Sequence, residues 1–468
     1  MNIQFQALEY RIDGKFQSAD YEFEGDMENG WQIHRNRKKH LKLGKGYRLL
    51  RNRMCGICAT DLSRRFLPFP LPQVIGHEIV AIDMETMEKS VVEINDTAYY
   101  RGEQPMDIYC RENLYTHTPG RMVLGIDRLP GGFGTYALAP KKSIIPIGRL
   151  NDYAGVLVEP FAAAFHAVLA STPENGDSVA VVGPRRLGTL LVAGLNAFRK
   201  SSGIDFEIVA VARHRDLLDL CHCFGSDREI DLQTVDEKQI HKQFDIVYDT
   251  TGTESGFRLS LSMAKKEIHL KSTNGQPVLG LKNLTPLVVD ELSILPFNEE
   301  TIHFKWKNEN RDNPEIFVAK GVTPGIPADR SVHKLDCTAA VKLLQGTLFQ
   351  DRLPRFDLAI ASSSEEIDSI IRPVEGSDIS LVRPRGAILF AGDAAGNPLL
   401  QFIQDGGRLR SSRCGDFEPA IRLLQENPEL SDAMSHFLVS HVFPCSELEK
   451  AFQYASKSSS RKVVVKHL

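Results

Sequence analysis

The chain has 468 residues, of which 42% are hydrophobic and 25% charged, and its formal net charge is -4. This composition is typical of a globular protein of two or more lobes, and the small net charge gives no reason to expect a nucleic-acid or membrane-surface partner. Its eight cysteines are too few for a disulfide framework, no stretch reaches the roughly 18 apolar residues of a membrane helix, and the start lacks the apolar run of a signal peptide, so we expect a cytoplasmic protein.

Residues 1 to about 150 contain short apolar runs that are broken by Gly, Pro and Asp. Examples are VVEIND, RMVLGID and GGFGTYALAP. Runs of this length and punctuation are typical of strands and turns. The sequence therefore predicts a mainly β lobe at the start of the chain.

After residue 156 the pattern changes to alternating helices and strands. Residues 157–171, LVEPFAAAFHAVLAS, have small and apolar residues at helical spacing. The following segments alternate between buried strands (178–183, 206–212, 244–252) and helices (187–200, 216–225). Such alternation predicts an α/β domain in which helices cover a parallel sheet.

Residues from about 296 to 408 interrupt this pattern as an insertion. Within them, FDLAIASSSEEIDSII and PRGAILFAGDAAGNPLL echo the earlier FDIVYDTTGTESGFRL and AKKEIHLKSTNGQPVLG. We interpret the echo as a partial internal duplication that extends the sheet. The alternative is that any two strand–helix units look alike at this level of comparison.

A separate question is whether Cys58 and His77 bind a metal. A thiolate and an imidazole suit zinc, and Glu159, at the start of a predicted helix, offers a carboxylate. Taken singly, each also has an ordinary interpretation, as a small buried residue, a core histidine and an acid at a helix N-terminus. Cys55 and Cys58 also fit a redox pair, although they do not open a helix in a thioredoxin-like setting.

Five segments taken together carry a resemblance: CGICATDL (55–62), GHE (76–78), VLGIDRLPGGFGTYALAP (123–140), VEPFAAAFHAV (158–168) and VVGPRRLG (181–188). In order and spacing the chain resembles the medium-chain dehydrogenase/reductase family, and within it the zinc-dependent alcohol and polyol dehydrogenases, over roughly residues 45–295 and 410–468. The resemblance implies a GroES-like, mainly β catalytic domain (1–155, completed by about 415–468). It also implies a Rossmann-type doubly wound domain (156–414) that carries the insertion.

The resemblance also implies roles for residues around the candidate zinc. Cys58 and His77 match zinc ligands, and Glu159 matches a carboxylate that binds zinc directly or through water. Thr60 matches a hydroxyl that relays the substrate proton, and Asp61 matches an acid that orients a ligand. Glu78 is expected to tune the field at the metal. At the end of the relay Ser63 stands where many members have a histidine.

Many members of the family carry a second, structural zinc on four closely spaced cysteines. In the matching region only Cys110 remains, with Thr118 about where the last ligand would fall. Since one thiolate cannot complete a tetrahedral site, we predict a single catalytic zinc per chain.

The expected phosphate-binding turn departs from the family pattern G-x-G-x-x-G. The chain has Gly183-Pro184-Arg185-Arg186-Leu187-Gly188, so the first and third glycines stand and the second is arginine. Arg185 either crowds the pyrophosphate or binds it through its guanidinium group, at a helix N-terminus that favours anions.

The second strand of this domain predicts the nucleotide. Where an acid would hold the ribose hydroxyls of NAD, the chain has Ala212, followed by Arg213 and Arg215. Two guanidinium groups and no acid favour the 2′-phosphate of NADP over NAD. The alternative is a solvated basic helix start. Thr250 and Thr251, and Thr273 after the next strand, are expected to line the nicotinamide side of the same crevice.

The sequence therefore predicts a zinc- and NADP-dependent oxidoreductase acting on a small alcohol, polyol or matching carbonyl. The alternative interpretation is a non-catalytic nucleotide-binding or regulatory protein on the same scaffold. Arg185, Ser63 and the insertion, which depart from the family pattern, favour this alternative. A zinc-free quinone or enoyl reductase is the least favoured, because Cys58 and His77 are both present. In this family the last strand of the nucleotide domain often pairs across a dimer axis. A homodimer is therefore a candidate assembly, and the insertion is placed to block or remodel it.

Overall fold

The structure is a computed structural model that describes residues 1–271, 277–282, 284–298, 314–322, 331–346, 353–374, 380–457 and 459–467. The chain divides into two compact units. Unit 1 comprises Met1–Ala162 and Asp416–Leu468, and unit 2 comprises Ala163–Gly415. The boundaries expected from the sequence lie at 155 and 415.

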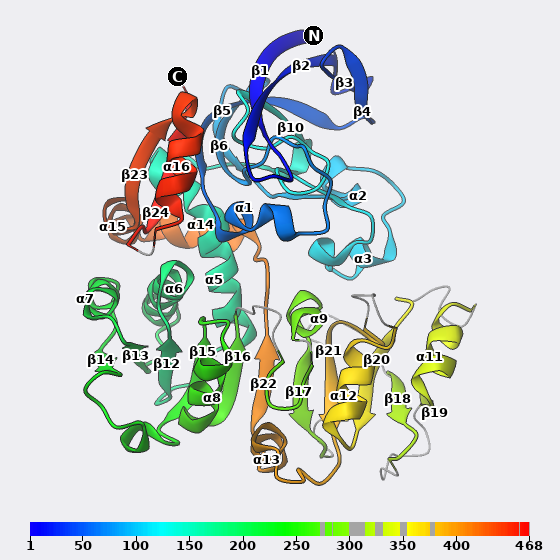
Figure 1. The fold of residues 1–468 in the computed structure, drawn as a ribbon, viewed down its shortest axis with the longest axis vertical. Helices are drawn as coiled ribbons and strands as arrows, with labels where there is room; N and C mark the ends of the chain where they lie inside the picture. Colours follow the sequence, from blue (N-terminus) through cyan, green and yellow to red (C-terminus); the bar gives the residue numbers. More distant parts are fainter. Residues whose placement is uncertain are drawn as a thin grey trace. The chain divides into compact units, whose positions relative to one another are not determined.

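Unit 1 begins with a four-stranded antiparallel sheet in which consecutive strands are neighbours: β1 (Asn2–Tyr10), β2 (Phe16–Asp26), β3 (Gly30–Arg35) and β4 (Lys38–Leu43) (Figure 1). The turn between β3 and β4 has only two residues, Asn36 and Arg37, and both have positive φ, 49° and 64°. Such turns match the twist of a tight hairpin. Alternate residues of β2, among them Tyr21 and Phe23, are buried and supply the core of this sheet.

The second sheet of unit 1 joins residues from both ends of the chain. Its order is β11-β7-β6-β5-β24-β23, and β10 also pairs with β5. The strands are β5 (Tyr47–Gly56), β6 (Glu78–Asp83), β7 (Lys89–Val92), β10 (Tyr136–Pro140), β11 (Ile144–Pro146), β23 (Val439–Pro444) and β24 (Lys462–Lys466). Because β24 pairs with β5, the last residues of the chain complete the sheet around the candidate metal site.

Short helices and one small strand pair connect these sheets. The pair is β8 (Asn95–Asp96) with β9 (Met122–Val123). The helices are α1 (Ala59–Leu62), α2 (Ala98–Arg101), α3 (Ile108–Arg111), α4 (Asp152–Val156), α14 (Phe417–Glu426), α15 (Pro428–Leu438) and α16 (Leu448–Ala455). Helix α5 (Val158–Ala170) spans the boundary between the units and coincides with the helix predicted for residues 157–171.

Unit 2 contains an 11-stranded sheet whose first six strands are parallel, in the order β14-β13-β12-β15-β16-β22. These strands are β12 (Ser178–Val182), β13 (Glu207–Ala212), β14 (Arg228–Asp231), β15 (Phe244–Asp249), β16 (Ala264–Leu270) and β22 (Arg408–Ser411), with helices α6 (Arg186–Ser202), α7 (Arg215–Cys223) and α8 (Glu254–Met263) between them. The first strand in the chain lies inside the sheet, as in dinucleotide-binding folds. The predicted parallel sheet is confirmed.

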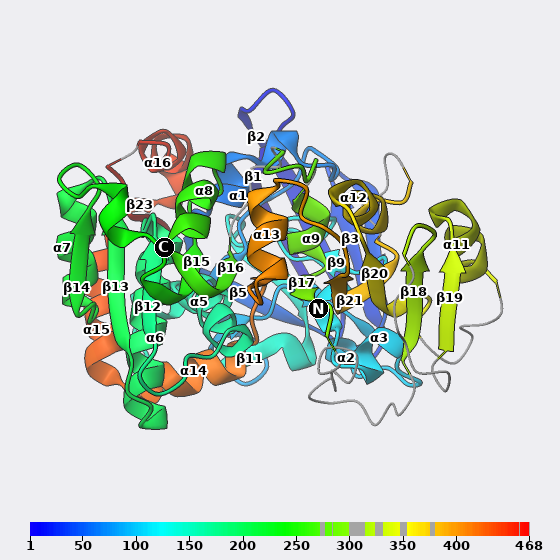
Figure 2. The same ribbon diagram turned by 90° about the horizontal axis from the view of Figure 1, so that it is seen from below.

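The other five strands follow in the order β17-β21-β20-β18-β19; β17 directly precedes the predicted insertion and the insertion supplies the other four (Figure 2). They are β17 (Ser293–Pro296), β18 (Glu315–Ala319), β19 (Ser331–Leu335), β20 (Phe356–Ala361) and β21 (Val382–Phe390), accompanied by α9 (Thr285–Val289), α11 (Cys337–Leu344), α12 (Ser364–Ile371) and α13 (Pro398–Gln404). One continuous hydrophobic core runs through the whole sheet. The insertion thus extends the sheet, as the sequence echo predicts.

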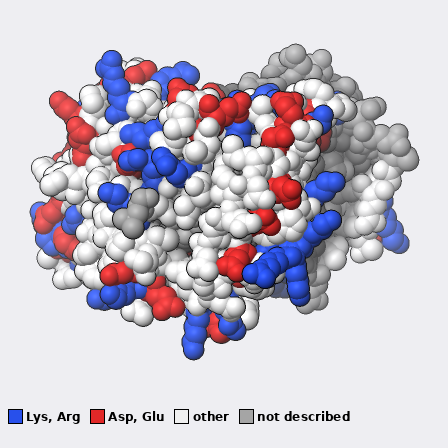
Figure 3. Space-filling view, turned by 90° about the horizontal axis from the view of Figure 1, so that it is seen from above, with Lys and Arg blue, Asp and Glu red and all other residues white. Residues whose placement is uncertain are grey.

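The surface drawn in Figure 3 mixes Lys and Arg with Asp and Glu side chains among uncharged residues. This mixture agrees with a formal net charge of only -4. Among the described residues, the helices are all too short or too polar to cross a bilayer.

Candidate functional site

The candidate metal site lies in unit 1, where the ends of two adjacent strands bring Cys58 and His77 together. Gly56 at the end of β5 pairs with Glu78 at the start of β6 in the antiparallel register. Cys58 follows Gly56 by two residues and His77 precedes Glu78 by one. Residues far apart in the sequence therefore meet because their strands are neighbours.

Cys58 caps the N-terminus of α1, and Asp61 in the first turn fixes its backbone. The Cys58 N–H donates to Asp61 Oδ2 at 2.8 Å, which satisfies one of the free amides of the helix start. The Thr60 hydroxyl lies 3.7 Å from the Cys58 thiol. Asp61 is only 1% exposed, so its carboxylate lies in the protein interior.

His77 is buried on the other side of Asp61. Its Nδ1 lies 3.4 Å from Asp61 Oδ1, and neither atom has a hydrogen bond of good geometry. Cys58, His77 and Glu78 each place a potential ligand atom within 4.8 Å of the others, the only group of three such residues in the described part of the chain. A thiolate, an imidazole and a carboxylate together form a donor set that zinc accepts.

Glu78 is fully buried and is paired with Lys462 of β24. Lys462 Nζ donates to both carboxylate oxygens at 2.6 Å. A Cβ at position 56 would lie 2.0 Å from Glu78 Oε2, so Gly56 is required to make room for this carboxylate. Sequence reasoning assigned no role to Lys462. The sequence feature that could have indicated such a role is the charged residue at the start of the apolar run KVVVK (462–466).

The net negative charge of this site favours the binding of a divalent cation. With zinc bound, Cys58 would be a thiolate and His77 neutral, so Asp61, Glu78 and Cys58 would carry three negative charges against the one positive charge of Lys462. Burial disfavours the charged form of His77, but the Asp61 carboxylate and Cys58 outweigh it and raise the pKa of His77 well above its usual value. The site therefore attracts positive charge, and its residues fit a zinc ion.

Glu159, in the first turn of α5, is not one of the three grouped residues. Burial raises the pKa of Glu159, Glu78 raises it further and His77 lowers it, so the carboxyl group is within electrostatic reach of the site. Its role as a zinc ligand stays a prediction.

Two other cysteines of unit 1, Cys55 and Cys110, are buried. The Cys55 thiol lies 3.5 Å from the Gly56 carbonyl oxygen, and burial raises its pKa well above its usual value. The Cys110 thiol lies 3.8 Å from the Thr118 hydroxyl, so the two positions singled out in the sequence are neighbours. Both thiols are free in this structure. Ser63 is exposed at the C-terminal end of α1.

The predicted phosphate turn joins β12 to α6 in unit 2. Gly183 has φ of 71°, and a Cβ there would lie 2.5 Å from Thr251 Cγ2. Glycine adopts this conformation readily and other residues do not, so the turn requires glycine at position 183. The Thr250 hydroxyl donates to the Val182 and Gly183 carbonyl oxygens at 2.9 and 2.8 Å. A Cβ on Gly188 would lie 2.6 Å from Thr250 Oγ1.

The arginines predicted to bind phosphate are exposed. Arg185 is the N-cap residue of α6, the 17-residue helix that follows the turn. Arg213 follows β13 and is exposed. Arg215 is 68% exposed and pairs with Asp219 at 2.8 Å on the same helix. Thr273 lies outside the described residues.

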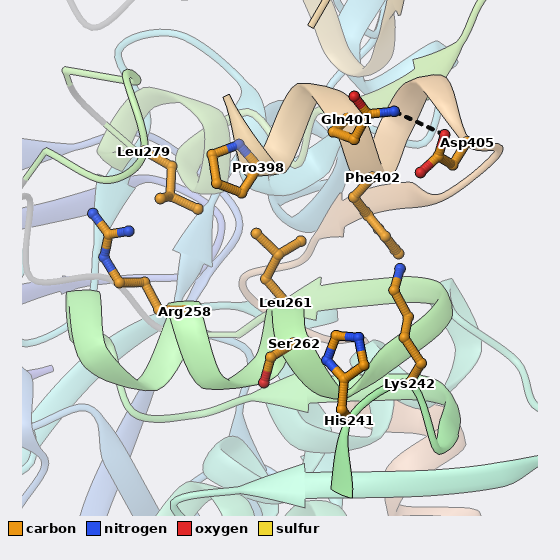
Figure 4. Close-up of a pocket in the computed structure, with 10 residues that line it drawn as sticks. All are labelled: His241, Lys242, Arg258, Leu261, Ser262, Leu279, Pro398, Gln401, Phe402 and Asp405. Carbon is orange, nitrogen blue, oxygen red and sulfur yellow. Dashed lines mark hydrogen bonds between the residues drawn. The ribbon is translucent and has the colours of Figure 1, made fainter. Parts of the chain in front are cut away.

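Two pockets of moderate size lie away from these residues. One, of about 420 Å³, lies in unit 2 (Figure 4) and contains none of the predicted site residues. Lys242 points toward the ring of Phe402 across it, with Nζ 4.9 Å from the ring centre. The other, of about 380 Å³, is a polar hollow in unit 1 that includes Asp96, Arg101 and Thr118.

Comparisons with known proteins agree with this geometry. Residues 44–149 match the alcohol dehydrogenase GroES-like domain. The chain is 24% identical to a sorbitol dehydrogenase of Halalkalibacterium halodurans over 324 residues, which cover 64% of this chain and 92% of the relative.

Solved structures show the same fold at low identity. L-idonate 5-dehydrogenase from Escherichia coli has a TM-score of 0.55 at 14% identity and covers 100% of this chain and 99% of its own. An alcohol dehydrogenase from Thermotoga maritima has a TM-score of 0.57 at 13% identity, with 100% of both chains covered.

Proposed function

Because the chain belongs to the medium-chain dehydrogenase/reductase family and is an alcohol dehydrogenase-like oxidoreductase, we propose that it transfers hydride between NADP(H) and a small alcohol, polyol or matching carbonyl with one zinc ion. The observation that carries this proposal is the meeting of Cys58, His77 and Glu78 within 4.8 Å. The non-catalytic alternative is not favoured, since the similar proteins are named as dehydrogenases.

Cys58 and His77 would hold the zinc, with a carboxylate from Glu78 or Glu159 beside them. When bound, zinc polarises a carbonyl oxygen or lowers the pKa of an alcohol so that it reacts near neutral pH. Asp61 would keep the His77 ring in the orientation that binding requires, because its Oδ1 lies 3.4 Å from Nδ1.

Thr60 is the candidate for moving the substrate proton. Its hydroxyl is both a donor and an acceptor and lies 3.7 Å from the Cys58 thiol, next to the atoms that would hold the metal. The chain has Ser63 rather than a titratable side chain one turn further on, so the proton would leave through a hydroxyl group or directly to water.

Unit 2 would supply the nucleotide site. The tight turn at Gly183 and the N-terminus of α6 favour the pyrophosphate, because the free amides of a helix start attract anions. Arg185 and Arg213 are exposed, and among the described residues neither forms an ion pair with a carboxylate, which supports NADP over NAD.

Metal analysis of the purified chain is the first test. We expect close to one zinc per chain, and we expect Cys58→Ser and His77→Ala to lose it. Cys223→Ser, which replaces an exposed cysteine of unit 2, is the matched control and should keep the metal. Wild-type protein that contains no metal when purified without chelators would refute the zinc centre.

Activity and nucleotide preference are tested separately. A substrate panel should begin with sorbitol and L-idonate, since similar proteins are named for them. We expect Arg213→Ala to weaken NADPH binding about tenfold, as loss of one charge-assisted phosphate contact would, and to leave NADH binding nearly unchanged. Equal losses for both nucleotides would contradict the NADP assignment.

A further inference from the structure

The 11-stranded sheet of unit 2 consists of two half-sheets with the same strand order. Counted from β13, the strand next to the edge strand β14, the first half has the order β13-β12-β15-β16-β22. Counted from its edge, the second half has the order β19-β18-β20-β21-β17. Within each half the strands are parallel, whereas the pair that joins the halves, Ile294 of β17 with Leu409 of β22, is antiparallel. The first half has six strands, because β14 lies outside β13, and five of them correspond in position to the five strands of the second half, so the two sets of five are related by an approximate two-fold axis.

Details of hydrogen bonding support a common origin of the two halves. In the first half Asp245, the second residue of β15, accepts the N–H of Ser178, where β12 begins, at 3.0 Å. In the second half Asp357, the second residue of β20, accepts the N–H of Glu315, where β18 begins, at 2.8 Å. In both halves, an aspartate at the second position of one strand thus accepts the first N–H of the neighbouring strand.

A second contact repeats at the start of the neighbouring strands. Ser178 and Glu207 are paired across β12 and β13, and the serine hydroxyl donates to the carboxylate at 2.6 Å. Glu315 and Ser331 are paired across β18 and β19, with the same bond at 2.6 Å and the partners exchanged. The register also shifts directly after Phe244 in β15 and after Phe356 in β20.

We propose that β17–β21 are a second copy of the nucleotide-domain sheet that serves as an in-chain partner for the outer edge of β22, so that the protein is a monomer. A strand edge pairs with one neighbour only, and the edge of β22 that a second chain would use is already taken by β17.

The junction has the character of a permanent core. Ile294 and Leu409 are both fully buried. Ser411 beside them donates to the Leu287 and Leu292 carbonyl oxygens at 3.0 Å each. A contact this dry does not open and close at low energetic cost.

A buried carboxylate ties the two halves further. Glu291 accepts the N–H of Arg413, which follows β22, at 2.7 Å and the Arg385 guanidinium of β21 at 2.7 Å, and it lies 3.0 Å from His166 Nε2. The chain itself also crosses between the halves twice, because β17 follows β16 and β22 follows β21. Neither half can leave the other without unfolding.

The second copy has a much shorter connection at the place where the first copy has α6. The first copy has 24 residues between β12 and β13, which include the 17-residue helix α6, whereas only 11 residues separate β18 from β19. A helix of that length does not fit in 11 residues. The feature that both copies retain is therefore the edge at which they pair.

Two measurements on the full chain test the proposal. Light scattering should give a mass of 52.3 kDa at all concentrations, and a persistent mass near 104.6 kDa, twice that value, would overturn it. The double variant Ile294→Cys with Leu409→Cys should then form a disulfide under mild oxidation, because directly opposed residues of antiparallel strands lie within disulfide distance.

The proposal requires that this disulfide lie within one chain. On a non-reducing gel the oxidised double variant should migrate as a monomer, and peptide mass spectrometry should find residues 294 and 409 linked. The two single variants are matched controls and should form no such link. A link that joins two chains, which would appear in mixed isotope-labelled samples, would show that the strands pair between copies. A folded double variant without any link would show that these residues are not neighbours.

Discussion

Glu93 in unit 1 gives a quantitative test of the electrostatics near the candidate site. The residue follows β7 and is 4% exposed, and its Oε1 accepts hydrogen bonds from the backbone N–H and the side-chain amide of Asn95. Burial raises the pKa of Glu93 from 4.5 to about 7, the bonds from Asn95 lower it, and Glu159 and Asp416 raise it further. The variant Glu93→Gln keeps an acceptor oxygen for Asn95 and removes the charge.

The expected effect follows from the difference between the folded and unfolded protein. Between pH 4.5 and about 7 the folded state binds the proton that the unfolded state has lost, so the stability of the wild type falls as pH rises through this interval. At about 1.4 kcal/mol per pKa unit, the charge costs about 3 kcal/mol at pH 8.5 and less than about 1 kcal/mol at pH 5. Glu93→Gln should therefore be more stable than the wild type by about 3 kcal/mol at the higher pH.

Urea unfolding followed by the emission of Trp31, which is buried in unit 1, measures this difference. Both proteins should carry Trp306→Phe so that only unit 1 is reported. Glu24→Gln, on the exposed face of β2, is the matched control and should change stability by less than about 0.5 kcal/mol. Equal stability of Glu93→Gln and the wild type at pH 8.5 would refute the assignment of a buried, costly charge at this position.

Three further predictions concern the two candidate sites. Lys462→Met leaves the buried Glu78 carboxylate without its partner. In paired unfolding experiments it should destabilise unit 1 by about 3–5 kcal/mol after chelation, and by less with zinc bound. Combining it with Glu78→Gln should recover most of the lost stability. Gly183→Ala places a methyl group at φ of 71° and 2.5 Å from Thr251 Cγ2. It should weaken nucleotide binding at least about tenfold, measured by calorimetry. The control Gly176→Ala, at a positive φ with no neighbour within 4 Å, should leave nucleotide binding unchanged. Zinc should remain bound on dialysis near pH 8 and be released near pH 5. The reason is that zinc competes with protons for Cys58 and for His77, whose pKa Asp61 raises. Retention of zinc at about pH 5 would contradict this set of ligands.

The sequence could predict elements whose signals are local. The alternation of apolar runs and helical spacing identified the strands that became β12, β13 and β15, because each is a short buried run of β-branched residues. The echo after residue 356 likewise indicated β20 and β21. The strands β17, β18 and β19 gave no comparable signal, because long polar stretches rather than segments with helical spacing lie between them in the sequence.

The candidate site depends on contacts that no local pattern contains. Cys58 and His77 meet because Gly56 and Glu78 are paired across β5 and β6, and the family resemblance, not periodicity, led to these two residues. Lys462 reaches Glu78 because β24 pairs with β5 from the far end of the chain, with Val464 opposite Gly56. A lysine at the head of an apolar strand indicates an inward-facing charge, but only the fold identifies its partner.

The position of β24 has a consequence for synthesis on the ribosome. The sheet that surrounds Cys58 and His77 lacks this strand, and Glu78 lacks its counterion, until residues 462–466 have left the exit tunnel. Residues 163–415 are translated in between and are free to adopt their structure first. A chain truncated before residue 462 should therefore fold residues 163–415 and leave the candidate metal site without β24 and without the Lys462 counterion of Glu78.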